Sequence, residues 1–100
     1  MATTSAPTVM TMTILELPGT GYRLRKPIIA EVEHDPAGFV ISEQSTGVFY
    51  YDADLSKVLS GFVKAFIEQF EFLQRNSKNL SPGLEAELER FQSLLETPAA

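Results

Sequence analysis

An α+β fold is expected for this chain of 100 residues: an antiparallel sheet of three to five strands, one long helix packed on one face, and a shorter C-terminal helix. Apolar and polar residues alternate through residues 22–33, which is typical of a strand with one buried face. After residue 54 the apolar residues recur with a period close to 3.6, as in an amphipathic helix. Short segments rich in Gly and Pro separate the expected strands and favour hairpin connections.

The first expected strand covers residues 10–17 and leads into the turn "PGTG" at 18–21, whose glycines accept positive φ. Pro27 cannot donate to a strand ladder, so it marks a bulge or an edge in the second strand. A turn at 33–38 and a turn at 45–47 then separate strands expected at 39–44 and 48–51. The apolar face of the second strand carries Tyr22, Leu24, Ile28, Ala30 and Val32.

A helix of about 20 residues is predicted over 54–75. Asp54 is suited to cap its first turn, because its carboxylate accepts from free amides and opposes the helix dipole. Gly61 lies in mid-helix at a cost of about 1 kcal/mol relative to Ala, and it would permit close packing against a strand or a second helix. Ser81 as N-cap and Pro82 at the first helical position start a second helix, predicted over 81–96. We expect this helix at a sheet edge or across a dimer.

The length fits a single domain, which we assign to residues 10–96, with disordered segments at 1–9 and 97–100. Hydrophobic residues make up 44% of the chain, which excludes disorder throughout. A domain of this size buries only about 60–65% of its unfolded surface. Burying one more apolar face against a second copy would stabilise it, so we expect a homo-oligomer.

The net charge of −5 argues against binding along a nucleic-acid backbone, which needs clustered Lys and Arg. A basic protein partner is compatible with this charge. The only basic cluster is "RLRK" at 23–26, expected on solvated strand positions. The chain has no cysteine, so disulfides and thiolate metal sites are not expected, and a cytoplasmic protein is the plain interpretation. No segment approaches the roughly 18 apolar residues that cross a bilayer, and no signal peptide is recognisable.

An enzymatic or metal-binding hypothesis would use the acidic residues near the only histidine. Metal sites usually recruit ligands from several elements, and the sequence identifies no such set. A nucleophile–base pair also has little to build on without cysteine or a paired serine motif. We therefore expect no catalytic residue, no metal and no cofactor. The residues considered for this hypothesis are Glu31, Glu33, His34, Asp35 and Asp52.

The aromatic run at 49–51 is the strongest sign of an interface in the sequence. Side chains alternate between the faces of a strand, so one parity enters the core under the long helix and the other reaches the far face. Exposed aromatics there need a partner to cover them, unless the second helix or another layer does so. The residues that we assign to a protein interface are Phe49, Tyr50, Tyr51, Phe72, Leu84, Leu88 and Phe91.

Over residues 28–73 the chain resembles the HicB-like antitoxin domain, a degraded RNase-H-like fold. In that family a Gly-Tyr strand start leads to a Pro-Gly-Cys corner and then to a Gly-Asp-Thr-x-Glu-Glu-Ala helix entry. Here Gly38-Phe39 is similar to the strand start and Gly47-Val48 to the corner, and residues 52–58 occupy the helix entry. The departures are Asp52 for the glycine, Asp54 for the capping threonine, and Ser56 and Lys57 for the two glutamates.

The resemblance implies a non-catalytic, oligomeric protein that neutralises a small basic ribonuclease toxin. Such antitoxins often carry a DNA-binding segment after the domain. Here one acidic helix follows, with neither a helix-turn-helix nor a basic strand, so an orphan domain of the family is the expectation. The alternative is a homo-oligomeric structural or regulatory protein without a toxin partner.

Overall fold

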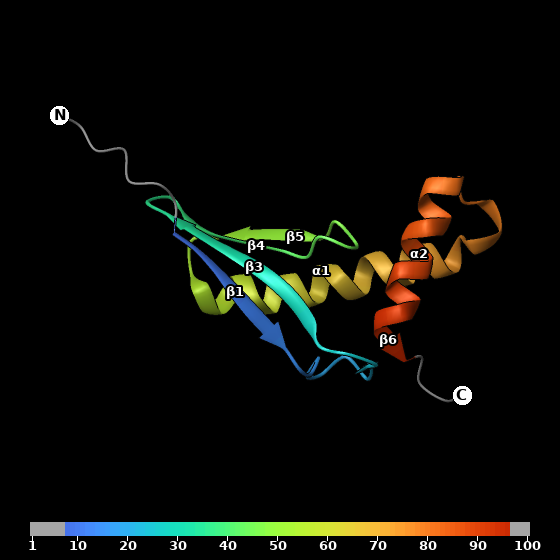
Figure 1. Cartoon of the computed structure of the whole chain (residues 1–100), viewed down its shortest axis with the longest axis horizontal. Coiled ribbons are helices and arrows are strands. Elements are labelled where there is room, and N and C mark those ends of the chain that lie inside the picture. Colours follow the sequence, from blue (N-terminus) through green and yellow to red (C-terminus); the bar gives the residue numbers. More distant parts are fainter. Residues whose placement is uncertain (1–7, 97–100) are drawn as a thin grey trace.

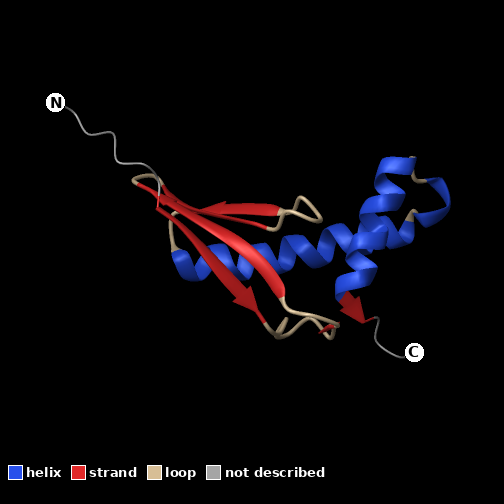
Figure 2. Cartoon of the chain, in the orientation of Figure 1, coloured by secondary structure: helices blue, strands red, loops and turns tan. Residues whose placement is uncertain are grey.

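The computed structural model describes residues 8–96, so residues 1–7 and 97–100 of the segments predicted to be disordered lie outside it. The predicted architecture is confirmed. Within the described residues, a four-stranded antiparallel sheet is followed by one long helix and a shorter C-terminal helix. Figures 1 and 2 show the long helix running along one side of the sheet, with the second helix against its far end.

The four-stranded sheet has the order β1-β3-β4-β5, and every neighbouring pair is antiparallel. Its edges are therefore β1 and β5. A separate pair joins β2 to β6, far apart in the sequence. The strands are β1 (Thr8–Ile14), β2 (Arg23–Leu24), β3 (Ile28–Asp35), β4 (Gly38–Ser42), β5 (Phe49–Asp52) and β6 (Leu95–Glu96).

Several predicted strand boundaries were wrong; those predicted at 39–44 and 48–51 are shifted by one or two residues, to Gly38–Ser42 and Phe49–Asp52. The first strand begins at Thr8, inside the predicted tail, and ends at Ile14 rather than at residue 17. The strand predicted through 22–33 is interrupted at residues 25–27, where Pro27 lacks the N–H that a ladder requires. The turn predicted at 33–38 is shorter, because β3 continues to Asp35. The Asp35 carboxylate closes that turn by accepting from the backbone N–H groups of Ala37 and Gly38 at 2.8 and 3.1 Å.

The long helix α1 (Leu55–Arg75) packs on the inner face of the sheet, mainly against β4 and β5. Asp54 caps it as predicted, accepting from the N–H of Ser56 at 2.9 Å. The predicted apolar stripe is the buried side of this helix, and it meets the buried residues of β3 and β4. The fully buried side chains of that contact include Val32, Ile41, Val58, Phe62, Phe66 and Phe70.

The second helix α2 (Pro82–Leu94) follows a short 3₁₀ turn at Ser77–Asn79 and packs on α1 of the same chain. Ser81 is its N-cap, as predicted, and accepts from the N–H of Leu84 at 3.3 Å. The ring of Phe91 lies 4.8 Å from Phe66 and 5.8 Å from Phe70, so three aromatic rings join the two helices. The helix was predicted to reach residue 96, but Leu95 and Glu96 leave it to form β6.

Candidate protein-binding surface

The strand β5 divides its aromatic residues between the two faces of the sheet. Phe49 and Tyr51 lie opposite Ser42 and Val40 of β4 and project away from α1. Their side chains are 68% and 52% exposed, so no described part of the chain covers them. The Tyr51 hydroxyl donates to the carbonyl of Ala37 at 2.7 Å, which fixes the direction of that ring.

Tyr50 has the opposite orientation and packs on the inner face. It pairs with the buried Ile41, and its ring lies against Gly61 in the middle of α1. A side chain at position 61 would overlap this ring, so the missing Cβ of Gly61 is what lets helix and strand approach so closely. The expectation of close packing at Gly61 is confirmed, and Tyr50 belongs mainly to the packing between sheet and helix.

The outer sheet face is the side of the sheet that points away from α1. The cross-strand register places two rows across it: Thr11, Glu31, Ser42 and Phe49 in one, and Val9, Glu33, Val40 and Tyr51 in the other. Its charged members are two glutamates, so this face has negative potential beside exposed apolar side chains. We define the outer sheet face as Val9, Thr11, Thr13, Ile29, Glu31, Glu33, Val40, Ser42, Phe49 and Tyr51.

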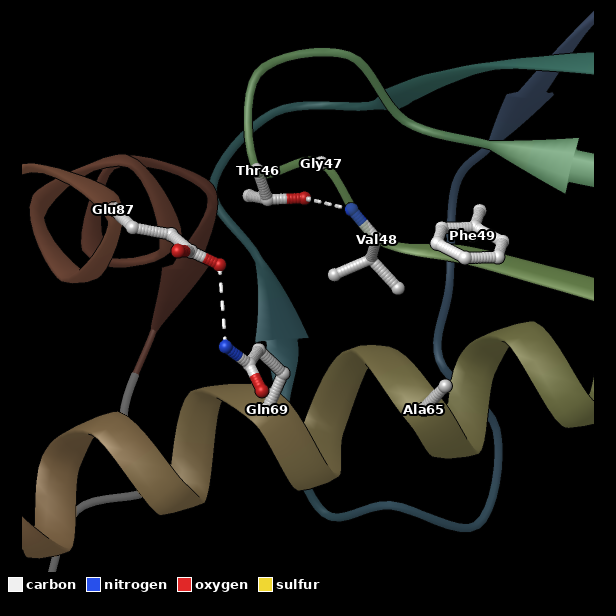
Figure 3. Close-up of a pocket in the computed structure, with 7 residues that line it drawn as sticks. All are labelled: Thr46, Gly47, Val48, Phe49, Ala65, Gln69 and Glu87. Atoms are coloured by element: carbon white, nitrogen blue, oxygen red, sulfur yellow. Dashed lines mark hydrogen bonds between the residues drawn. The ribbon is translucent and has the colours of Figure 1, made fainter. Parts of the chain in front are cut away.

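A small cleft opens at the start of β5, next to Phe49. It has a volume of about 240 Å³ and lies between the turn that precedes β5 and the two helices. Figure 3 shows Gln69 of α1 and Glu87 of α2 at one end of this cleft, with Phe49 and Ala65 at the other. The Gln69 amide donates to the Glu87 carboxylate at 3.3 Å. The cleft therefore has an acidic end and an aromatic end.

The turn that forms the wall of this cleft is held by Glu43, whose side chain is only 7% exposed. Its carboxylate accepts from the N–H groups of Ser45 and Thr46 at 2.9 and 2.7 Å and from both hydroxyls. Burial by itself would raise the pKa of Glu43, but these hydrogen bonds to the charged form prevail and lower it. A single buried carboxylate thus fixes the turn that leads to Phe49.

The acidic residues considered for a metal site do not come together. Glu31 and Glu33 project from the outer sheet face, whereas His34 and Asp52 share the opposite parity with Phe39. The imidazole of His34 stacks on the Phe39 ring at 4.2 Å, and the Asp52 carboxylate accepts from the N–H of Asp54 at 2.9 Å. Asp35 closes its own turn. Among residues 8–96, no group of three or more His, Cys, Asp or Glu side chains could hold a metal ion.

The basic cluster at 23–26 is partly structural. Arg25 donates from Nε to the carbonyls of Gln92 and Leu95 at 3.1 and 3.0 Å, at the C-terminal end of α2. A cation there satisfies carbonyls that the helix leaves free and complements its dipole. Arg23 and Lys26 are exposed, in agreement with the expectation of solvated positions.

The other residues assigned to an interface fall into two groups. Phe72 on α1 and Leu84 on α2 are exposed, at 47% and 36%. Leu88 and Phe91 are buried within the chain, because the apolar stripe of α2 packs against α1. They therefore offer no surface to a partner in this structure. Ala65, Gln69 and Glu87 of the cleft were missed, since they come from two helices and no local pattern joins them.

A search against protein-family models finds no match, and searches of curated proteins and of solved structures find no significant match either. The likeness to HicB-like domains consequently rests on the residues given above and stays a prediction. In residues 8–96 neither helix combines the length and apolarity needed to cross a membrane.

Proposed function

We propose that this chain is a non-catalytic protein-interaction module of the HicB-like kind, which binds a small basic protein through its outer sheet face. The observation that carries the proposal is the exposure of Phe49 and Tyr51 on one face, in rows shared with Glu31 and Glu33. Aromatic anchors flanked by charge are typical of protein interfaces. The net charge of −5 adds a general attraction for a basic partner.

The two aromatic side chains have the properties of binding anchors. Each presents a large apolar area, and burying such a ring in a partner contributes on the order of 2 kcal/mol or more. Tyr51 loses little conformational freedom on binding, because its hydroxyl is already fixed on Ala37. Phe49 follows the turn held by Glu43, so its backbone is also pre-organised.

Charge explains why a basic partner fits best. Glu31 and Glu33 would steer such a partner to the outer sheet face and stabilise the complex in a salt-dependent way. The cleft at the start of β5 has room for one Lys or Arg side chain, whose cation would reach Glu87 at its acidic end. A partner with basic residues around an apolar patch would satisfy both features.

The test begins with capture of partners from native cells by the tagged chain, followed by binding measurements on the purified pair. We expect a small basic protein at stoichiometric yield. The double variant Phe49→Ser/Tyr51→Ser should raise the Kd at least about a hundredfold, because it removes two anchors. Phe72→Ser is the matched control, an exposed aromatic on α1 outside this face, and should leave the Kd unchanged.

Charge reversal gives an independent readout. Glu31→Lys/Glu33→Lys should slow association and reduce the dependence of the Kd on salt. If Phe72→Ser abolished binding and the double serine variant retained it, the partner would bind near Phe72 on α1 and not on the outer sheet face. Recovery of the chain alone, with no second protein, would contradict the proposal and favour the homo-oligomeric structural or regulatory alternative. Cytoplasmic location belongs to the same proposal and is checked by fractionation of the cells.

A further inference from the structure

Among residues 8–96, the strand β1 is an edge of the sheet that lacks the usual protection against pairing. It has seven residues, Thr8–Ile14, and pairs along its whole length with β3, which leaves one row of backbone N–H and C=O groups pointing outward. Natural edge strands are normally shortened, bulged or marked by charge or proline. β1 has none of these features, whereas the other edge, β5, has only four residues and ends at Asp52.

The three central residues of β1, Met10, Thr11 and Met12, read the same in both directions, and Val9 and Thr13, on either side of them, are β-branched residues of similar size. If two copies of β1 pair antiparallel about a two-fold axis at Thr11, all seven residues of each strand find a partner. Met10 then lies opposite Met12 of the second copy, Val9 lies opposite Thr13, and Thr11 lies opposite itself. No charged residue faces another in this register, although each chain carries a net charge of −5.

The inner side of β1 is also incompletely covered, because α1 packs mainly against β4 and β5. Met10 is 47% exposed, and Met12 and Ile14 are half-buried. Beside them runs an open apolar groove of about 390 Å³, lined by Ile14, Pro18, Ser56, Leu59, Ser60 and Val63. A second β1 strand would continue this apolar row across the axis, so that Met10 and Met12 of one copy would pack beside Met12 and Met10 of the other.

We infer that β1 is the homodimer interface of this protein, and that two copies join their sheets into one continuous antiparallel sheet through β1 with the two-fold axis at Thr11. The pairing forms about six to eight backbone hydrogen bonds, depending on which alternate residues point outward. It is isologous, since the same strand serves both copies. The outer sheet faces of the two copies remain free, so this inference does not depend on the proposed basic partner.

The first test is the association state of the purified whole chain, measured by sedimentation velocity over a wide concentration range. We expect a dimer. Thr11→Lys places two ammonium groups directly opposite each other at the axis and should raise the Kd of dimerisation at least about tenfold. The matched control is Ser42→Lys, in the same cross-strand row and on the same face but in an interior strand; it should leave the Kd unchanged.

Cysteine crosslinking tests the register and does not depend on the stability of the lysine variant. The chain has no cysteine, so Thr11→Cys carries a single thiol. In the proposed register its Cα lies about 4.5–5.5 Å from its symmetry mate, within disulfide range. Thr13→Cys, on the same strand and face, would be about 14 Å from its mate and should not crosslink.

Four results would overturn the inference. The first is a chain that stays monomeric at every accessible concentration. The second is a dimer that Thr11→Lys does not weaken and Thr11→Cys does not crosslink, which would use another face. The third is crosslinking of Thr13→Cys in place of Thr11→Cys, which would show that the two-fold axis lies at a residue other than Thr11. A monomer whose β1 strand pairs with a different protein in native cells would likewise reject self-pairing.

Discussion

Gly61→Ala tests whether the inward packing of Tyr50 depends on the missing side chain of Gly61. In an ordinary helix interior this change stabilises the protein, because Ala is favoured over Gly by about 1 kcal/mol. Here a Cβ at position 61 would lie 2.5 Å from Cζ and 2.6 Å from Cδ2 of Tyr50, well inside van der Waals contact. The ring must therefore move by about 1 Å or leave its position.

The size of the effect follows from two opposed contributions. Overpacking of this kind costs about 1–3 kcal/mol, against the gain of about 1 kcal/mol from helix propensity. Tyr50 is 37% exposed, so the ring can swing outward, which keeps the cost at about 2 kcal/mol, near the middle of that range. We expect Gly61→Ala to lower the free energy of unfolding by about 1 kcal/mol, the opposite of the usual sign.

The assay is urea denaturation at one fixed protein concentration, because self-association would shift the apparent stability. The four proteins are the wild type, Gly61→Ala, Tyr50→Ala and the double variant. Without the ring, Gly61→Ala should stabilise by about 1 kcal/mol, giving a coupling free energy of about 2 kcal/mol. Gly83→Ala in α2 is the matched control, since a Cβ there meets nothing within 4 Å. Equal stabilisation by Gly61→Ala with and without the Tyr50 ring would refute the reasoning.

Two further predictions concern the supports of the fold. Glu43→Gln should lower the free energy of unfolding by about 2 kcal/mol at neutral pH, because it removes the charged acceptor of Ser45 and Thr46. The folded-state pKa of Glu43 is lowered from its ordinary value of 4.5, so the wild type loses this advantage as the pH falls below that value. Melting temperatures of both proteins should converge there, and a gap that persists unchanged to about pH 3 would contradict the argument. Arg25→Met should cost about 1 kcal/mol in urea denaturation by freeing the carbonyls at the end of α2; an equal loss in the exposed neighbour variant Lys26→Met would show that the hydrogen bonds are not the cause.

Much of the architecture follows from local patterns. The alternation of residues 22–33 predicted a strand with one buried face, and β3 (Ile28–Asp35) has that face, because side chains that alternate along a strand point to opposite sides of the sheet. The period near 3.6 predicted α1. The predicted caps at Asp54 and Ser81 are also confirmed, and they could be foreseen because each accepts from an amide within the first turn of its own helix. Such signals depend only on residues close together in the sequence, so they can be recognised without knowledge of the tertiary structure.

No local sequence pattern predicted the pairing of β2 with β6. It joins Arg23 to Glu96 and depends on where α2 ends in space. The role of Arg25 on the carbonyls of α2 has the same origin, since those carbonyls lie 67 and 70 residues further along the chain. The candidate surface was therefore foreseen only in part: its aromatic strand is local, whereas the cleft with Gln69 and Glu87 requires two helices to meet.

The sequence by itself placed an aromatic strand ahead of a capped helix and required its residues to alternate between two faces. It could not decide which parity faces the core, because Val48 with Tyr50 and Phe49 with Tyr51 are both apolar enough to be buried. The tertiary structure decides it through Gly61, whose position on α1 leaves room for the Tyr50 ring. Tyr50 and Val48 accordingly turn inward, and Phe49 and Tyr51 are left on the outer sheet face.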